Sequence, residues 1–391
     1  MKGLTGFLSL ALVIVIAAAA PAALAQAPPA PAPSPTPAAA PSSAPAPAAG
    51  DEFFPSEAQK PHVVFQWDFL GRYDTIEHLV FRPDIERARF EFRPELDFVV
   101  SDRFRVGARA VGDWGTDRNT DNDLNFDNYR SRGAALDRCF VEGKPGSFNL
   151  KAGSFGMPLV ASEMLWDHDL PMLGAAAAWE VRSGDSSFTI AGVGSRGPQR
   201  EGDRTRVEAG QLVWRSGDPN HFSIEAAGSF WNFELDHLKI AFIRQNYVEP
   251  PNEGGPAFVS KFQIADALVR FRFPIGAAPV QLSFDGLKNF GSRAEAKGDD
   301  RAFEASVTVG SVGTPGQVRG FYTFQYVERE AVLGAYNTDD WWFHSWYRGH
   351  RIGLAVTVLP QTFIQGTAVY QERLDRHFFI KRYTADLVKM F

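Results

Sequence analysis

The chain has 391 residues and a formal net charge of −6, and this mild acidity argues against nucleic acid as a partner. Cys139 is its single cysteine, which excludes an intramolecular disulfide. The length suffices for one large β domain or two ordinary domains.

The first 25 residues carry the features of a secretory signal peptide. Lys2 gives a positive start, an apolar run extends over Phe7–Ala20, and Ala23-Leu24-Ala25 forms a small-x-small cleavage site. No later stretch approaches the ~20 continuous apolar residues that a membrane-spanning helix needs. We therefore expect an exported protein without a helical membrane span.

Residues 26–60 are predicted to form a linker, because residues 26–50 consist almost only of Ala, Pro and Ser. Such a segment has little to bury and favours an extended polyproline backbone, so it is a semi-rigid spacer. It serves either as a tether that contacts cell-wall material or as an unstructured leader. The remainder, residues 61–391, shows no second linker and is predicted to be one domain.

The stretch Ile85–Ala110 alternates apolar and charged residues. One parity is apolar and holds Ala88, Phe90, Phe92, Pro94, Leu96, Phe98, Val100, Phe104, Val106, Ala108 and Ala110. The other parity is charged and holds Arg87, Arg89, Glu91, Arg93, Glu95, Asp97, Arg103, Arg105 and Arg109. Because successive side chains of a strand point to opposite faces, this pattern predicts an antiparallel hairpin that reverses at Ser101-Asp102. Pro94 cannot donate to the ladder, so we expect a missing bond or a bulge beside it.

Comparable strands recur along the rest of the chain. The predicted strands are residues 63–70, 85–100, 104–110, 134–142, 148–155, 175–182, 188–193, 206–215, 222–230, 262–273, 280–287, 303–309, 318–327, 352–358, 363–372 and 381–391. Short turns and long loops alternate between them, which places all short turns at one end and all long loops at the other. A Greek-key sandwich has no reason to sort its connections in this way.

This sorting is typical of a transmembrane antiparallel β-barrel with about sixteen strands, short periplasmic turns and long extracellular loops. Ten residues at ~3.3 Å each, tilted by ~45°, span about 24 Å, which matches the ~25 Å apolar band of such barrels. The apolar parity would face lipid and the charged parity would line a water-filled lumen. Several aromatic residues fit the outer wall: Trp67, Trp179, Phe273, Tyr322, Phe324, Tyr326 and Tyr383.

Two segments resemble a known family. Residues 148–179, FNLKAGSFGMPLVASEMLWDHDLPMLGAAAAW, look like the putative porin family related to the phosphate-selective (O/P-type) porins of Gram-negative bacteria. The last strand, RYTADLVKMF, is similar to the terminal signal read by the barrel-assembly machinery, with Tyr383, Leu387 and Phe391 in phase. The resemblance implies a location in the cell outer membrane, contact with its lipid, and a homotrimer.

In general porins the third outer loop folds into the lumen, and the third long loop here is residues 156–174. It carries Glu163, Asp167 and Asp169. The resemblance implies that these carboxylates form a constriction opposite lumen arginines, namely Arg87, Arg89, Arg93, Arg105, Arg109, Arg270 and Arg272. Opposed charges across a narrow pore select solutes by size and charge. The alternative is that the carboxylates stay at the outer mouth and only solvate the loop.

No residue pattern predicts catalysis, a metal or a cofactor. His168 between two aspartates cannot place all three side chains on one metal, and no Ser/His grouping or nucleophile elbow occurs. The acidic segment Asp117–Asp127 lacks the full EF-hand spacing. Trp341 and Trp342 are interpreted as part of an aromatic rim girdle, with sugar stacking as the alternative.

The sequence therefore predicts a porin for passive diffusion of small polar or anionic solutes, with no enzymatic activity. The excess of arginine on the charged parity motivates the anion preference. Two other classes stay open. One is a non-conducting barrel that acts as an adhesin or anchor, and the other is a soluble secreted β-sandwich that binds carbohydrate.

Overall fold

The computed structural model describes residues 61–79, 83–116, 133–196, 204–218, 220–236, 246–248, 258–293, 298–376 and 378–390. The predicted signal peptide, the predicted linker up to residue 60, the acidic segment 117–127 and Phe391 lie outside these residues.

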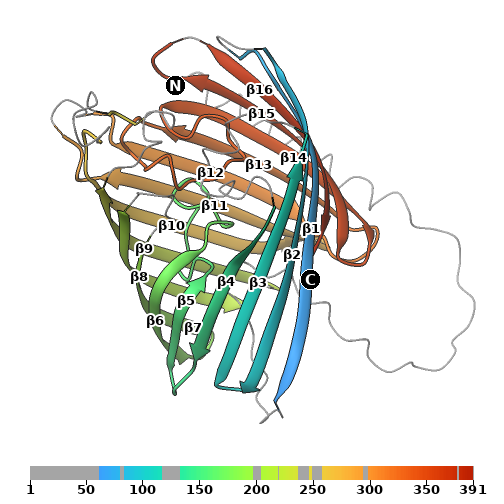
Figure 1. The fold of residues 1–391 in the computed structure, drawn as a ribbon, viewed down its shortest axis with the longest axis vertical. Coiled ribbons are helices and arrows are strands. Elements are labelled where there is room, and N and C mark those ends of the chain that lie inside the picture. Colours follow the sequence, from blue (N-terminus) through green and yellow to red (C-terminus); the bar gives the residue numbers. More distant parts are fainter. Residues whose placement is uncertain are drawn as a thin grey trace, which may run out of the picture.

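Sixteen antiparallel strands close into one barrel (Figure 1). They are β1 His62–Glu77, β2 Ile85–Ser101, β3 Phe104–Gly115, β4 Gly133–Gly143, β5 Phe148–Phe155, β6 Met172–Ser183, β7 Ser186–Arg196, β8 Arg204–Asp218, β9 Phe222–Asp236, β10 Phe262–Ile275, β11 Ala278–Asn289, β12 Arg301–Gly310, β13 Val318–Val327, β14 Tyr347–Leu359, β15 Thr362–Arg373 and β16 Phe379–Lys389. Each strand pairs with its neighbours in sequence, and β1 pairs with β16 from Phe69↔Lys389 to Glu77↔Lys381. This closure confirms the predicted barrel and excludes the β-sandwich.

The connections are sorted between the two ends of the barrel as predicted. One end, the short-turn rim, carries tight reversals such as Gly184-Asp185 and Gly276-Ala277. Both glycines adopt a left-handed backbone, with φ of 56° and 61°, which residues with a side chain rarely reach. The other end, the long-loop rim, carries the longer connections. Several boundaries were predicted wrongly. β1 extends to Glu77 instead of residue 70, and β14 begins at Tyr347 instead of residue 352. β6 begins at Met172 and its ladder to β5 starts at Phe155↔Met172, so the third loop is residues 156–171.

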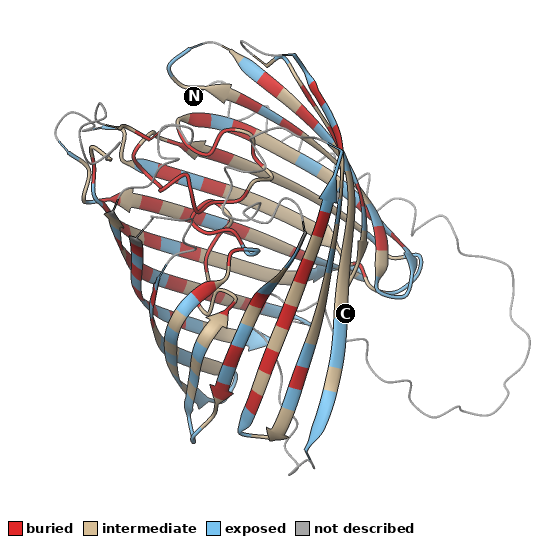
Figure 2. Ribbon diagram, viewed as in Figure 1, coloured by how far each residue is buried: buried red, intermediate tan, exposed pale blue. Residues whose placement is uncertain are grey.

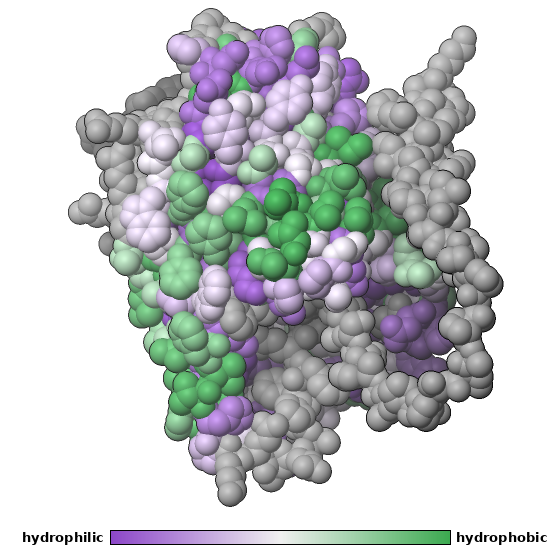
Figure 3. Space-filling view, turned by 90° about the vertical axis from the view of Figure 1, so that its right-hand side faces the viewer, coloured by the Kyte–Doolittle hydropathy of each residue, from purple (hydrophilic) through white to green (hydrophobic). Residues whose placement is uncertain are grey.

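The two parities of each strand face opposite media. In β3 every second residue from Arg105 to Asp113 is buried, while Phe104 and Trp114 of the other parity are exposed. Around the barrel, large apolar side chains stay on the outside, such as Phe65, Phe230 and Leu354 at 48–55% exposure. Figure 3 shows hydrophobic side chains gathered across the middle of one outer face, with hydrophilic side chains above them. An apolar band of this kind suits a lipid environment.

The pairing between β2 and β3 is interrupted beside Pro94, and its register is the same on both sides of the interruption. Pairing between β2 and β3 runs to Phe92↔Gly112 and resumes at Glu95↔Arg109, while the pairing with β1 continues through Trp67↔Pro94. The interruption at Pro94 is thus accommodated without a bulge, and the side chains on either side keep their lipid and lumen faces. Among the described residues no helix is long and apolar enough to cross a membrane.

Candidate functional site

Two long connections turn into the barrel instead of staying at its rim. They are loop 3, residues 156–171 between β5 and β6, and loop 7, residues 328–346 between β13 and β14. Trp166 and Tyr336 have no exposed surface, and Trp341 keeps 1%. Figure 2 shows these buried stretches of coil inside the strands. Loops at a membrane surface are normally hydrated, so burial of this extent means that both loops pack against the lumen wall.

Loop 3 is fastened to inward-facing side chains on several sides of the barrel. Gln211 on β8 accepts from the Val160 amide at 2.8 Å and donates to its carbonyl at 2.6 Å. Arg270 on β10 donates to the Ala161 carbonyl at 3.3 Å. These contacts hold the first half of the loop against β8 and β10, two and four strands beyond β6.

The acidic residues of loop 3 reach two further strands. Glu163 pairs with Arg351 on β14 at 2.7 Å, and Asp169 pairs with Arg93 on β2. Because β2, β8, β10 and β14 are spread around the barrel, the loop crosses the lumen. Burial would raise the pKa of Asp169, but the guanidinium of Arg93 outweighs it and lowers that pKa to about 2. Asp169 therefore stays ionised at neutral pH, with half of its side chain exposed to lumen water.

Loop 7 holds four wall arginines through two neighbouring aspartates. Asp340 lies 2.8 Å from Arg72 on β1 and 3.0 Å from Arg351 on β14. Burial would raise the pKa of Asp340, but these two arginines outweigh it and hold the pKa well below its usual range. The pairs are charge-assisted and largely shielded, so each is stronger than a surface ion pair.

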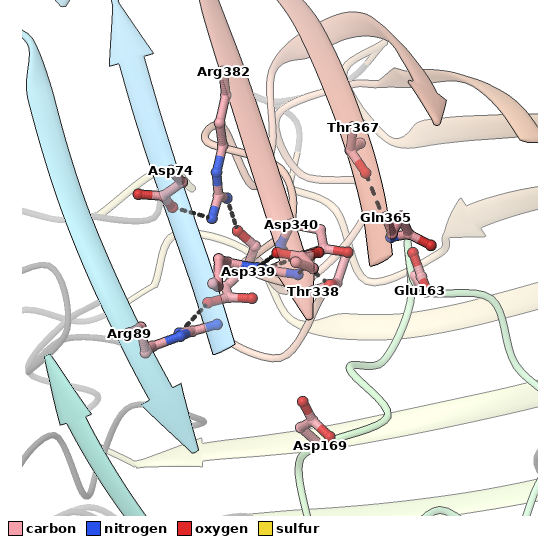
Figure 4. A network of polar contacts seen from close by, with 12 residues as sticks. Asp74, Arg89, Glu163, Asp169, Thr338, Asp339, Asp340, Gln365, Thr367 and Arg382 are labelled. Atoms are coloured by element: carbon pink, nitrogen blue, oxygen red, sulfur yellow. Dashed lines mark hydrogen bonds and ion pairs between the residues drawn. The ribbon is translucent and has the colours of Figure 1, made fainter. Parts of the chain in front are cut away.

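The neighbouring Asp339 lies 3.1 Å from Arg89 on β2, and its carbonyl accepts from Arg382 on β16. Figure 4 shows Arg89 and Arg382 converging on Asp339, with Asp74 beside Arg382. Arg382 also pairs with Asp74 at 2.7 Å, which links loop 7 to β1 and β16 at the seam of the barrel.

The two loops are joined by an aromatic cluster and by backbone bonds. Trp166 of loop 3 stacks on Tyr336 of loop 7 with ring centroids 4.9 Å apart, and on Trp231 of β9 at 6.1 Å. The Thr338 amide donates to the Glu163 carbonyl at 3.1 Å, and the Asp167 amide donates to the Tyr336 carbonyl at 2.7 Å. Loops 3 and 7 therefore form one packed layer inside the barrel.

The arginines predicted from the sequence fall into three groups. The structure brings Arg89, Arg93 and Arg270 into contact with the two inner loops, as described above. It pairs three more with wall carboxylates: Arg87 with Asp74 at 2.8 Å, Arg105 with Glu142 at 2.9 Å, and Arg109 with Asp137.

Arg272 and Asp167 have neutral partners in the described contacts. Arg272 donates to the Gln281 side chain at 2.9 Å. Asp167 is buried and caps backbone amides, accepting from Asp169 at 3.0 Å and from Asp339 at 3.3 Å.

Sequence reasoning missed loop 7 and three of the four arginines that contact it. Trp341 is wrongly interpreted as a rim girdle, because it is buried and packs against Tyr347 with ring centroids 5.7 Å apart. Arg72, Arg351 and Arg382 share the lumen parity of their strands, but only Arg382 lies within a predicted strand, because the predicted strands 63–70 and 352–358 stop short of Arg72 and Arg351. Nothing in the sequence of loop 7 distinguishes an inner loop from an outer one.

Of the three residues of the predicted C-terminal assembly signal, the structure describes Tyr383 and Leu387. Tyr383 and Leu387 lie on the outer face of β16, each 43% exposed. Within the described ranges, no group of three or more His, Cys, Asp or Glu side chains is arranged to hold a metal ion.

Residues 76–195 match the family model described as "Putative porin". No curated protein matches the sequence. Among solved structures, OprB of Pseudomonas putida is 10% identical with a TM-score of 0.60, over 84% of this chain and 94% of that one. A loop-deletion variant of OmpT, an outer membrane protein of Vibrio cholerae, is 8% identical with a TM-score of 0.52, over 85% of this chain and all of that one. At such identities the likeness shows the fold alone, and that fold is the sixteen-stranded barrel described above.

Proposed function

We propose that this chain, a porin-like barrel with a putative porin match over residues 76–195, forms a water-filled channel in the cell outer membrane. Small polar or anionic solutes would cross it by passive diffusion, with no chemical step. One observation carries the proposal. Loop 3 is fastened across the lumen by contacts to β2, β8, β10 and β14, and these contacts support a constriction of the barrel at that height.

The charges around loop 3 support a selective passage. Asp169 and Glu163 lie on the loop, and Arg93, Arg109 and Arg270 lie on the wall. Asp169 keeps half of its side chain in contact with water, so it faces the open part of the lumen. Opposed charges at such a height would order a polar solute and select it by size and charge.

A non-conducting barrel that acts as an adhesin or anchor is the second candidate. Loop 7 favours it, because four arginines and the buried side chains Tyr336 and Trp341 occupy lumen volume in addition to loop 3. The two candidates share the same barrel and differ in whether an open path remains.

Reconstitution into planar bilayers separates the two candidates. Purified, folded protein should give discrete current steps in potassium chloride, and proteoliposomes that contain it should swell in small neutral and anionic solutes. Folded protein that gives neither steps nor swelling would overturn the channel and support the anchoring barrel. Heat-modifiable migration on gels would verify that the silent protein was folded.

The remaining proposals rest on the sequence and on its resemblance to porins. Residues 1–25 would direct export, and residues 26–60 would form a periplasmic linker with access to the cell wall. Tyr383, Leu387 and Phe391 would present the assembly signal. A homotrimer would be the assembled form, testable by cross-linking in native membranes.

A further inference from the structure

Most arginines that point into the barrel have their charge cancelled by a carboxylate. This holds along the whole arginine-rich wall and at the inner loops. The paired arginines are Arg72, Arg87, Arg89, Arg93, Arg105, Arg109, Arg182, Arg215, Arg270, Arg351, Arg373 and Arg382. A cancelled charge contributes little to the potential along the pore, so the number of lumen arginines overstates the attraction for anions.

Three inward-facing arginines make no ion pair with any carboxylate in the described part of the chain. They are Arg138 on β4, Arg272 on β10 and Arg319 on β13. Arg272 donates to the amide oxygen of Gln281 at 2.9 Å, and Arg319 donates to the amide oxygen of Gln365 at 2.9 Å. An amide oxygen orients a guanidinium without neutralising it, so both groups are positioned and keep their charge.

Arg138 reaches the lumen because of a β-bulge. The β3–β4 ladder passes from Arg109↔Arg138 to Ala110↔Leu136, which leaves Asp137 as the extra residue. Asp137 is buried and pairs with Arg109, which is the ladder partner of Arg138. Among the described residues, the Nε atom of Arg138 has no hydrogen-bond partner, and the pair between Arg109 and Asp137 does not cancel the charge of Arg138.

All three arginines lie beside loop 3 or between loop 3 and the short-turn rim. A Cβ at Gly156, the first residue of loop 3, would lie 2.9 Å from an Nη atom of Arg138. Arg272 lies two residues closer to the short-turn rim than Arg270, which holds loop 3. Arg319 is the second residue of β13, next to the short-turn rim. Between Arg272 and β13 the ladder carries Gln281 and Thr308, which are neutral.

Unpaired carboxylates offset these charges only in part. Glu95 on β2 is the ladder partner of Arg109 on β3, and its carboxylate offsets one positive charge there. Asp266, Asp285 and Glu304 keep only 4%, 1% and 8% exposure, so they do not face open water. Arg138, Arg272 and Arg319 are therefore the inward-facing wall arginines whose charge no ion pair cancels within the described residues.

We propose that Arg138, Arg272 and Arg319 form the anion path of this channel, a series of weak stations for small oxyanions such as carboxylates. The inference rests on the channel function proposed above. Separated stations suit conduction, because an anion that meets one guanidinium at a time binds weakly enough to leave. A planar guanidinium with free N–H groups matches the two oxygens of a carboxylate.

The test measures reversal potentials of single channels in gradients of potassium chloride and potassium acetate. R138Q, R272Q and R319Q should each lower the anion-to-cation permeability ratio about two- to threefold, since one charge at roughly 6 Å in screened water changes local ion concentration by that factor. The triple variant should lower it about tenfold. R138K should keep most of the wild-type ratio, because it keeps the charge.

R206Q is the matched control. Arg206 lies on the outer face of β8 with 67% of its side chain exposed, so its loss removes the same charge without reaching the lumen. Open channels whose permeability ratio in the triple variant equals that of R206Q would overturn the anion path and leave the channel intact. Wild-type protein without any channel would instead refute the proposed function. Heat-modifiability of each variant shows that the barrel is folded.

Discussion

Replacing Trp166 by alanine should release loop 3 from the lumen while leaving the barrel closed. Trp166 is fully buried, stacks on Tyr336 and Trp231, and donates to the Leu170 carbonyl at 3.2 Å. Deleting a buried Trp side chain costs about 3–5 kcal/mol. The strand ladder does not involve this side chain, so that cost falls on the docking of loops 3 and 7.

The expected consequence is a larger population of undocked loop. A loss of about 3–5 kcal/mol raises that population about a hundred- to several-thousandfold. Open-channel current noise should increase, and a protease added on the loop side should cut residues 156–171 faster than in wild type. Hydrogen exchange of the Val160 and Asp167 amides should accelerate, because both are bonded only while the loop is docked.

W214A is the control for this experiment. Trp214 lies on the outer face of β8 with 43% exposure, so its loss removes an indole from the apolar surface and leaves the loops untouched. W166A with wild-type noise, cleavage and exchange would refute the reasoning that loop 3 is held by this cluster. The same changes in W214A would show a general loosening of the barrel instead.

Three further predictions concern single groups. D340N should weaken the docking of loop 7 by about 2–4 kcal/mol through the loss of its ion pairs to Arg72 and Arg351, measured by hydrogen exchange of loop 7. The pKa of Asp340 is lower in the folded protein than in the unfolded chain, where it is about 3.9. The stability that Asp340 provides is therefore present above about pH 3.9 and disappears as pH falls through the folded pKa. Opening of loop 7 that becomes more frequent between pH 8 and 5, after correction for the intrinsic exchange rate, would contradict this. Burial raises the pKa of Glu330 in loop 7 to about 7, so the free energy of unfolding should fall as pH rises from about 4.5 to 7. At pH 8 E330Q should therefore be more stable than wild type by up to about 3 kcal/mol and unfold at a higher temperature, whereas at pH 4 it should show no gain. Cys139 should react in membranes with a lipid-soluble maleimide and not with a charged, water-soluble one, because it is exposed on the outer face of β4; equal reaction with both reagents would place it in the lumen.

The strands could be predicted because their signal is local. A side-chain period of two and turn residues between the strands suffice to count sixteen strands and to assign Phe90 and Arg89 to opposite faces. The same period places Arg89 and Arg93 on the lumen side, and in the longer strands of the structure it also applies to Arg72 and Arg351. It contains no information on what covers them, because the carboxylates that pair with Arg351 come from residues 163 and 340 of two loops far away in sequence.

The inward turn of loop 7 was beyond sequence reasoning for a related reason. Trp341 and Trp342 suit a membrane rim as well as a buried cluster, since both environments accept a large apolar ring with one polar group. The choice is made by tertiary partners, namely the stacking of Trp341 on Tyr347 and the fit of its ring against Gly349. Local composition is the same in both cases.

Parity fails at a bulge, and here that failure falls on a residue of the proposed anion path. Asp137 and Arg138 are neighbours in β4, so strict alternation sends one of them to lipid. The extra residue in the ladder instead turns both inward and restores the outward direction at Cys139. Without it, Arg109 would lose Asp137 as its partner or Arg138 would face the membrane. A single inserted residue therefore determines whether an uncancelled positive charge stands at the base of loop 3, and only the strand register reveals it.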